Sequence, residues 1–179
     1  MSANSYNTEE ELDAGKLKYY FESTGQTTIV KAIEYSPILQ IRGRQVYNLG
    51  FGDYDENTNS ASDNSISNNG DAYKVFNTVL NTIPAFFAKN PGGIIFVQGS
   101  DSDDDYFNKC HLTCRKKCTD VCKNAGRRIS TYRWYVDKHY EELVKDYSFL
   151  GGIIDETNNQ TTTEVYKKGV GYDVILVYK

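Results

Sequence analysis

The fold is decided by the stretch DAYKVFNTVLNTIPAFFAKNPGGIIFVQGS (71–100). Apolar residues recur every three or four positions along its first half, which predicts one face of an amphipathic helix. Pro84 should kink this helix or end its regular part, and the turn sequence NPGG (90–93) should stop it. The apolar run GIIFVQGS (93–100) is typical of a strand buried on both faces. The stretch therefore predicts a long helix that leads into a central strand.

Three strands are expected before the helix, because short runs rich in aromatic and β-branched residues precede it. Gly25 and Gln26 supply the hairpin turn between the first two runs. A loop rich in Asn, Ser and Asp (56–70) separates the third run from the helix. The three runs are KYYFES (18–23), TTIVKAIEY (27–35) and VYNLGFGDYD (46–55).

After the central strand, a second long helix is expected from Ile129 to Tyr147, where apolar residues again recur at helical spacing. Two further runs, FLGGIID (149–155) and EVYKKGVGYDVILVYK (164–179), are expected to close the chain as strands. The predicted order of elements is β-β-β-α-β-insertion-α-β-β. This order indicates an α+β fold, with two long helices and a largely antiparallel or mixed sheet of about six strands.

The length of 179 residues fits one domain with an insertion. Residues 1–16 are polar and acidic and lack periodicity, which predicts a flexible tail. A single α+β domain is then expected over residues 17–179. Within it, residues 101–126 differ in composition from both neighbours and contain all four cysteines. We interpret this cysteine segment (101–126) as a helical insertion.

The composition excludes several classes of protein. Lys and Arg number 20 against 24 Asp and Glu, and the net charge of −4 argues against a basic nucleic-acid-binding protein. No run approaches the ~20 apolar residues that span a membrane. The first residues contain no apolar segment of the signal-peptide type. We therefore expect a cytoplasmic protein with reduced thiols.

The first helix start contains candidate binding residues. Asn69 or Asp71 is a natural N-cap, and the unpaired N–H groups of a helix start attract anions. Lys74 lies in the first turn, where the helix dipole disfavours a cation unless it meets a carboxylate such as Asp53 or a bound anion. An ordinary capped helix with a solvated lysine would explain the same residues.

The second helix start offers Arg128, which is suited to bidentate contact with phosphate or carboxylate. Tyr132 lies on the same helix face, and Ser100 ends the central strand. A surface arginine lying over Tyr132 is the alternative interpretation. If the two helix starts converge, they form an anion-accepting cleft. The predicted ligand-binding residues are Asp53, Asn69, Asp71, Lys74, Ser100, Arg128 and Tyr132.

The four cysteines, Cys110, Cys114, Cys118 and Cys122, repeat every fourth residue. On one unbroken helix they form a stripe, and the first and last sulfurs are roughly 18 Å apart along the axis. Such a helix cannot bring four thiolates to one zinc ion, whose Zn–S bonds are ~2.3 Å long. Three interpretations stay open: an apolar face lined by thiols, a zinc site that uses a helix break or outside ligands, and redox or disulfide chemistry.

Several motifs resemble an uncharacterised bacterial family, a domain of unknown function. They are YNLGFGDYD (47–55), SNNGDAYKVFNTV (67–79) and IIFVQGS (94–100), followed by Arg128 with Tyr132. Family members share an NNGDxxKV helix start and a GS pair followed closely by an RxxxY helix start. This chain departs by placing residues 101–126 between these last two motifs, so the resemblance marks the cysteine segment as an extra insertion. It supports the fold and the candidate site but implies no reaction.

The leading functional hypothesis is a binding or interaction module. Its expected partner is a small anionic ligand or a protein, a second copy of the chain included. The alternative is an acetyltransferase-like or nucleotide-using enzyme, because the order of elements resembles acetyltransferase-like cores, with the turn at 68–71 in place of the pyrophosphate loop. The glycine-rich motif of those enzymes and the common nucleotide-binding motifs are absent. A third hypothesis is a zinc or redox module in the cysteine segment.

Overall fold

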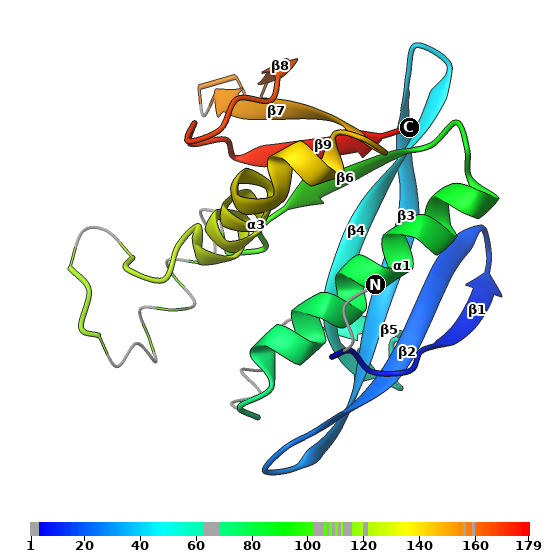
Figure 1. The fold of residues 1–179 in the computed structure, drawn as a ribbon. Helices are drawn as coiled ribbons and strands as arrows, with labels where there is room; N and C mark the ends of the chain where they lie inside the picture. Colours follow the sequence, from blue (N-terminus) through cyan, green and yellow to red (C-terminus); the bar gives the residue numbers. More distant parts are fainter. Residues whose placement is uncertain are drawn as a thin grey trace. The chain divides into compact units, whose positions relative to one another are not determined.

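The computed structural model (Figure 1) describes residues 4–62, 69–101, 106, 108, 110, 112, 116–119, 122–155, 157, 158 and 160–179. Contacts within the chain divide it into two compact units, and each unit is described by itself. The first unit comprises Met1–Ile95 with Lys179, and the second comprises Phe96–Tyr178. The acidic run 102–105, His111 and Cys114 lie outside the described residues.

The first unit is built on antiparallel strands, each paired with the next along the chain. Two of their connections are the two-residue turns Ala14-Gly15 and Arg42-Gly43, in which both residues have positive φ. Such type I′ turns match the right-handed twist of the strands that they join. The strands are β1 (Glu9–Asp13), β2 (Lys16–Thr24), β3 (Thr28–Ile41), β4 (Arg44–Asp55) and β5 (Ser60–Ser62).

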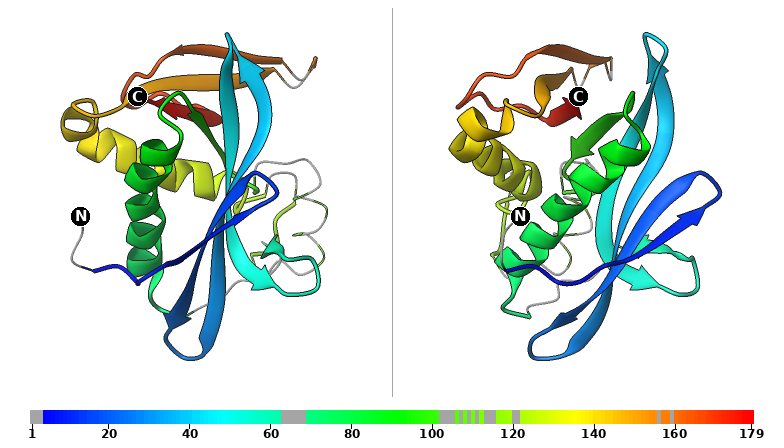
Figure 2. Two further views of the ribbon diagram at one scale, coloured as in Figure 1. Left: turned by 90° about the vertical axis from the view of Figure 1, so that its right-hand side faces the viewer. Right: turned by 45° about the vertical axis from the view of Figure 1, so that its right-hand side comes forward.

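Helix α1 (Ala72–Lys89) lies along one face of this sheet (Figure 2). The ring of Phe86 stacks on that of Tyr35 with centroids 4.4 Å apart, and both side chains are fully buried. A hydrogen bond of 2.7 Å joins the hydroxyls of Tyr35 and Thr82 in the same core. The helix continues through Pro84 to its C-terminal end, so this proline does not end the helix. The predicted amphipathic helix is therefore present.

The described part of residues 1–16 contains a strand and packs against the rest of the first unit, so it does not form the predicted flexible tail. Strand β1 pairs with β2, and the Tyr6 N–H donates to Thr78 Oγ1 over 2.9 Å. The Tyr6 ring also stacks on Phe21, with centroids 5.4 Å apart. The only large apolar side chain of β1 is Leu12, so the segment lacks the periodicity from which a strand is predicted. Its acidic residues are typical of an edge strand protected against unwanted pairing.

The second unit contains helix α3 (Arg127–Leu143) and a sheet with the strand order β6-β9-β7-β8. Strand β7 pairs antiparallel with both β8 and β9. Ile129 and Val136 of α3 are buried, as are most residues of β9. Strand β6 starts in the first unit, to which Ile94 and Ile95 belong, and continues into the second. The strands are β6 (Ile94–Gln98), β7 (Ser148–Asp155), β8 (Gln160–Val165) and β9 (Val174–Tyr178).

The α+β fold class is confirmed, but the expected number of about six strands was too low. The described residues form nine strands. Strand β1 was taken for a tail, and the three-residue β5 was assigned to a loop. Strand β8 consists of fully exposed, mostly polar residues, which resemble a loop in sequence. Among the described residues, no helix has the length and apolar character needed to cross a membrane.

Gly151 leaves room for the fully buried ring of Tyr172, because a Cβ at this position would lie 2.4 Å from ring atoms. We expect Gly151→Ala to destabilise the protein by about 1–3 kcal/mol, since the buried ring must shift. Gly92 is the matched control, because a Cβ there would meet no atom within 4 Å. Urea unfolding of both variants measures the effect. Equal stability of the two variants would contradict this account of the packing.

Candidate functional site

The side chain of Asn69 is buried and links the start of α1 to the β2–β3 hairpin. Its oxygen accepts the Thr27 N–H over 3.0 Å, and its amide donates to the Thr27 carbonyl and to Ser23 Oγ, both over 2.9 Å. The backbone of Asn69 approaches Gly25 so closely that a Cβ on Gly25 would lie 2.1 Å from the Asn69 carbonyl oxygen. The contacts of this predicted ligand-binding residue are therefore those of a structural clamp.

Asp71 stands at the N-cap position of α1, but its carboxylate makes no capping hydrogen bond. The carboxylate accepts hydrogen bonds from Ser23 Oγ at 2.7 Å and from the Tyr6 hydroxyl at 2.8 Å. Burial alone would raise the pKa of Asp71, but these two hydrogen bonds and the charge of Lys31 bring it below its ordinary value. The carboxylate thus fastens the N-terminal segment and β2 to the start of α1.

Lys74 and Asp53 each have a partner inside the first unit. The Lys74 ammonium lies 3.7 Å from the centroid of the Tyr6 ring, which is a cation–π contact. Asp53 forms an ion pair with Lys31, whose side chain is buried between β2 and β4. Phe51 contributes a further ring 5.9 Å from the Lys31 ammonium. The charges of both residues are therefore engaged by neighbouring side chains.

At the start of α3, the structure brings Ser100 and Arg128 together across 28 residues of sequence. The Arg128 guanidinium donates a hydrogen bond to Ser100 Oγ. Burial lowers the pKa of Arg128 and raises the pKa of Tyr132 one turn further along. The guanidinium of arginine is effectively always protonated in proteins. Around neutral pH, Arg128 is therefore charged and Tyr132 is a neutral hydroxyl that can donate a hydrogen bond.

Asp101 is a site residue that sequence analysis missed. Its carboxylate is buried and accepts the Arg128 backbone N–H over 3.0 Å, while its carbonyl accepts the Gly126 N–H over 2.9 Å. Its second carboxylate oxygen makes no hydrogen bond within the described residues. The only signal in the sequence is its position directly after Gly99-Ser100. The acidic residues that follow it made Asp101 look like part of an acidic run. The chain thus supplies its own carboxylate at the helix start where a bound anion was predicted.

The predicted ligand-binding residues fall into two groups in different units. Asp53, Asn69, Asp71 and Lys74 belong to the first unit, and Ser100, Arg128 and Tyr132 belong to the second. Each group is therefore considered on its own. The convergence of both helix starts in one cleft stays a prediction.

The cysteine segment is helical only in part of its described residues. Cys110 has helical backbone, whereas Cys118 and Cys122 lie outside helices. Lys117 has a φ of 48°, a left-handed conformation that an α-helix does not continue through. An unbroken helix with a cysteine stripe, which one of the three interpretations assumed, is therefore not what the described residues form. No group of three or more His, Cys, Asp or Glu side chains placed to hold a metal ion occurs among the described residues, and Cys114 is not one of them.

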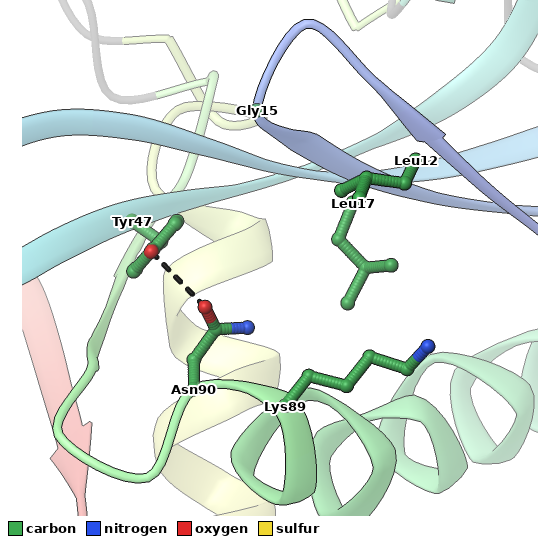
Figure 3. Close-up of a pocket in the computed structure, with 6 residues that line it drawn as sticks. All are labelled: Leu12, Gly15, Leu17, Tyr47, Lys89 and Asn90. Carbon is green, nitrogen blue, oxygen red and sulfur yellow. Dashed lines mark hydrogen bonds between the residues drawn. The ribbon is translucent and has the colours of Figure 1, made fainter.

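A pocket of about 290 Å³ opens in the first unit, between the β1–β2 turn and the C-terminal end of α1 (Figure 3). The side chains of Leu12, Leu17 and Tyr47 provide apolar surface, and Lys89 and Asn90 provide polar groups. The Tyr47 hydroxyl donates to Asn90 Oδ1 over 3.1 Å, which fixes one wall. The volume lies at the small end of the range for ligand pockets, roughly 300–1,000 Å³.

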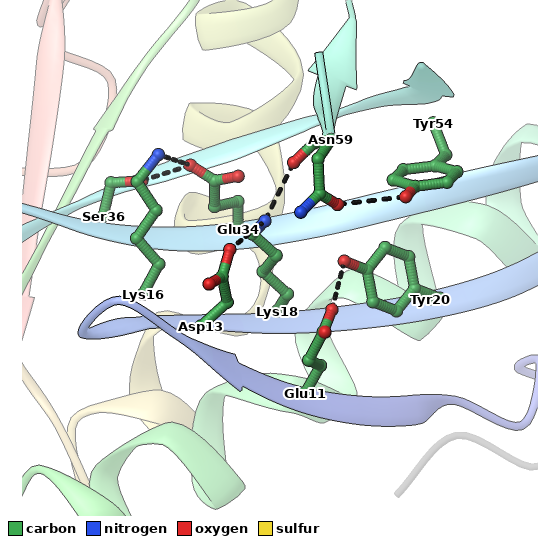
Figure 4. A network of polar contacts seen from close by, with 9 residues as sticks. All are labelled: Glu11, Asp13, Lys16, Lys18, Tyr20, Glu34, Ser36, Tyr54 and Asn59. Carbon is green, nitrogen blue, oxygen red and sulfur yellow. Dashed lines mark hydrogen bonds and ion pairs between the residues drawn. The ribbon is translucent and has the colours of Figure 1, made fainter. Parts of the chain in front are cut away.

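The opposite face of the same sheet carries a polar network (Figure 4). The buried Lys18 ammonium donates to Asp13 over 3.0 Å and to the Asn59 carbonyl over 2.8 Å. Burial would raise the pKa of Glu34, but hydrogen bonds from Ser36 and Lys16 and nearby lysine charges lower it. These charges neutralise one another, so the network is best understood as support for the sheet.

The fold and these contacts define an α+β protein with a charged helix start in its second unit and an apolar pocket in its first. A model of a family of unknown function, DUF6934, matches residues 2–108. Because this match spans more than half of the chain, the protein belongs to that family. It includes the YNLGFGDYD and NNGDAYKV motifs and ends within the cysteine segment. No curated protein and no solved structure matches the chain.

The hydrogen bonds of Asp71 predict a pH dependence of stability. Its pKa is lower in the folded state than the ordinary value of 3.8, so it stabilises the fold above that pH and ceases to as the pH falls through the folded value. We expect Asp71→Asn to lower the free energy of unfolding by about 1–2 kcal/mol at pH 7, and by progressively less as the pH falls below 3.8. Unfolding in urea across this range measures the difference.

Glu22→Gln is the matched control, because Glu22 is an exposed acid next to Ser23 on β2. Its stability should follow the wild-type profile at every pH. A difference between Asp71→Asn and wild type that stays constant with pH would contradict the assigned role of the carboxylate.

Proposed function

We propose that this protein is a binding module whose second unit holds a small anion, a phosphate or a carboxylate, at the start of α3. The observation that carries the proposal is the hydrogen bond from the Arg128 guanidinium to Ser100 Oγ. It supports a site in which the Arg128 guanidinium and the Ser100 hydroxyl, which flank the cysteine segment, lie side by side. An arginine fork suits two oxygens of one anion.

The contacts of Asp101 indicate which groups such an anion would use. Its carboxylate already accepts the Arg128 N–H, so this backbone donor of α3 is engaged. A second anion near that carboxylate would be repelled. The proposed ligand therefore contacts side chains: the Arg128 guanidinium, the Ser100 hydroxyl and the Tyr132 hydroxyl. In the first unit, the contacts of Asn69, Asp71 and Lys74 support structural roles, so we leave these residues out of the proposed site.

A titration with inorganic phosphate, followed by the amide NMR signals of residues 126–132, tests this proposal. We expect Arg128→Ala to weaken phosphate binding by about tenfold or more, because a charge-assisted hydrogen bond is lost. Ser100→Ala should weaken it by about threefold, since a neutral hydrogen bond contributes less. Both variants should keep the unfolding temperature of the wild type within a few degrees.

Arg127→Ala is the matched control, because it removes the same charge from the exposed first position of the same helix. It should change phosphate binding by less than about twofold. An equal loss in Arg127→Ala and Arg128→Ala would reduce the effect to general charge and overturn the proposal. The absence of any saturable phosphate response would overturn it as well.

An acetyltransferase-like enzyme is the second candidate, and the observed order of elements supports it. Five antiparallel strands, β1 to β5, precede α1, and strand β6, helix α3 and the closing strands follow. This order resembles the core of acetyltransferase-like folds. The enzyme hypothesis predicts that acetyl-CoA raises the unfolding temperature in a thermal-shift assay, whereas CoA-free acetyl phosphate does not. An unchanged unfolding temperature at millimolar acetyl-CoA would reject it.

A further inference from the structure

A second site lies in the first unit, at the pocket between the β1–β2 turn and the end of α1 (Figure 3). The register of the two strands determines what this pocket contains. Leu12 pairs with Leu17, and the next pair on the same face is Glu10 with Tyr19. An apolar pair therefore lies beside a polar pair, and both are on the face that carries the contact to α1.

The apolar part of the pocket is formed by aliphatic side chains and one aromatic ring. Leu17 is buried, whereas Leu12 is 75% exposed at the rim. Tyr47 closes the far side, held by its hydrogen bond to Asn90. A large aliphatic side chain that is this exposed beside a pocket is surface that a bound hydrocarbon chain would cover.

The polar end of the pocket is formed by Lys89 and Asn90. The Lys89 ammonium forms an ion pair with Glu10, and about half of its side chain is exposed. The buried Tyr19 hydroxyl is not part of the pocket lining, and it lies beside the same Glu10 carboxylate. Burial and the neighbouring Glu10 carboxylate raise the pKa of Tyr19, so this hydroxyl keeps its proton and stays a donor.

Glu10 shows which kind of group the Lys89 ammonium binds. Hydrogen bonds and charge from Lys89, together with the nearby Tyr19 hydroxyl, lower the pKa of Glu10 and hold it as a carboxylate. The ion pair is half-exposed, and such pairs contribute little to stability, about 0–1 kcal/mol. A second carboxylate can therefore replace Glu10 on Lys89 at small cost.

We propose that this pocket binds an aliphatic monocarboxylate, with the hydrocarbon chain between Leu12, Leu17 and Tyr47 and the carboxylate on Lys89 in place of Glu10. The single ammonium matches a single negative charge. The small volume and aliphatic lining match a short or medium unbranched chain. Glu10 acts in this site as an internal competitor for the ligand.

Calorimetric titration of the whole protein with butanoate, hexanoate and octanoate tests the proposal. Affinity should rise by about two- to fourfold for each added methylene, because each one leaves water for the apolar pocket. Lys89→Met, which keeps the aliphatic stem and removes the charge, should weaken octanoate binding by about tenfold or more, whereas Lys89→Arg should retain it.

Glu10→Gln provides a test with the opposite sign, because removing the competing carboxylate should tighten octanoate binding several-fold. Lys145→Met, an exposed lysine of the second unit, should leave octanoate binding unchanged, and Lys89→Met should leave phosphate binding at α3 unchanged, so this site and the anion site at α3 can fail separately. Equal affinity for all three acids would overturn the proposal. It would also be overturned by an unchanged Lys89→Met or by weaker binding in Glu10→Gln.

Discussion

The buried amide of Asn69 is the contact on which the first unit depends. It bonds to Ser23 and Thr27 on both sides of the β2–β3 connection while its own backbone leads directly into α1. One side chain therefore fixes where the hairpin ends and where the helix starts. Any partner lost from this buried amide would leave a polar group unsatisfied, at a cost of about 1–3 kcal/mol. Nearby, Asp71 and Tyr6 extend the same connection to the N-terminal segment.

Both long helices start beside a carboxylate of the chain itself. Asp71 uses its carboxylate to hold side chains from other segments, and Asp101 uses its own to accept the Arg128 backbone N–H in the first turn of α3. The positive end of each helix dipole is thus compensated internally. An external anion gains little from the helix ends and must be recognised by side chains. This constraint leaves Arg128 as the central residue of the proposed anion site.

Much of the fold could be predicted from sequence, because α1 shows helical periodicity over a long stretch and β6 is a continuous apolar run. Strand β1 could not be predicted, since a strand stabilised by pairing and by Lys89 needs no apolar alternation. The left-handed backbone of Lys117, which interrupts any helix across the cysteine segment, is not signalled by its side chain.

For the candidate site, the positions of Asn69, Asp71, Ser100 and Arg128 at two helix starts could be predicted. Their partners could not. Tyr6 and Ser23 reach Asp71 from 65 and 48 residues away, and no local pattern encodes such contacts. The pocket could not be predicted from sequence for the same reason. Only the pairing of β1 with β2 in the folded protein brings Leu12 beside Leu17.

Asn69 is followed by Gly70, and an asparagine before a glycine is prone to deamidation. In a flexible chain, the Gly70 backbone nitrogen attacks the side-chain amide carbon of Asn69, ammonia leaves, and water opens the resulting succinimide to aspartate or isoaspartate. In the folded protein, five hydrogen bonds hold the amide and oppose this attack. Each unfolding event removes that protection, and the aspartate that results would place a carboxylate against two backbone carbonyls. The longer the chain stays unfolded, the more of it deamidates at Asn69, and a chain altered in this way cannot re-form the native hydrogen bonds of this residue.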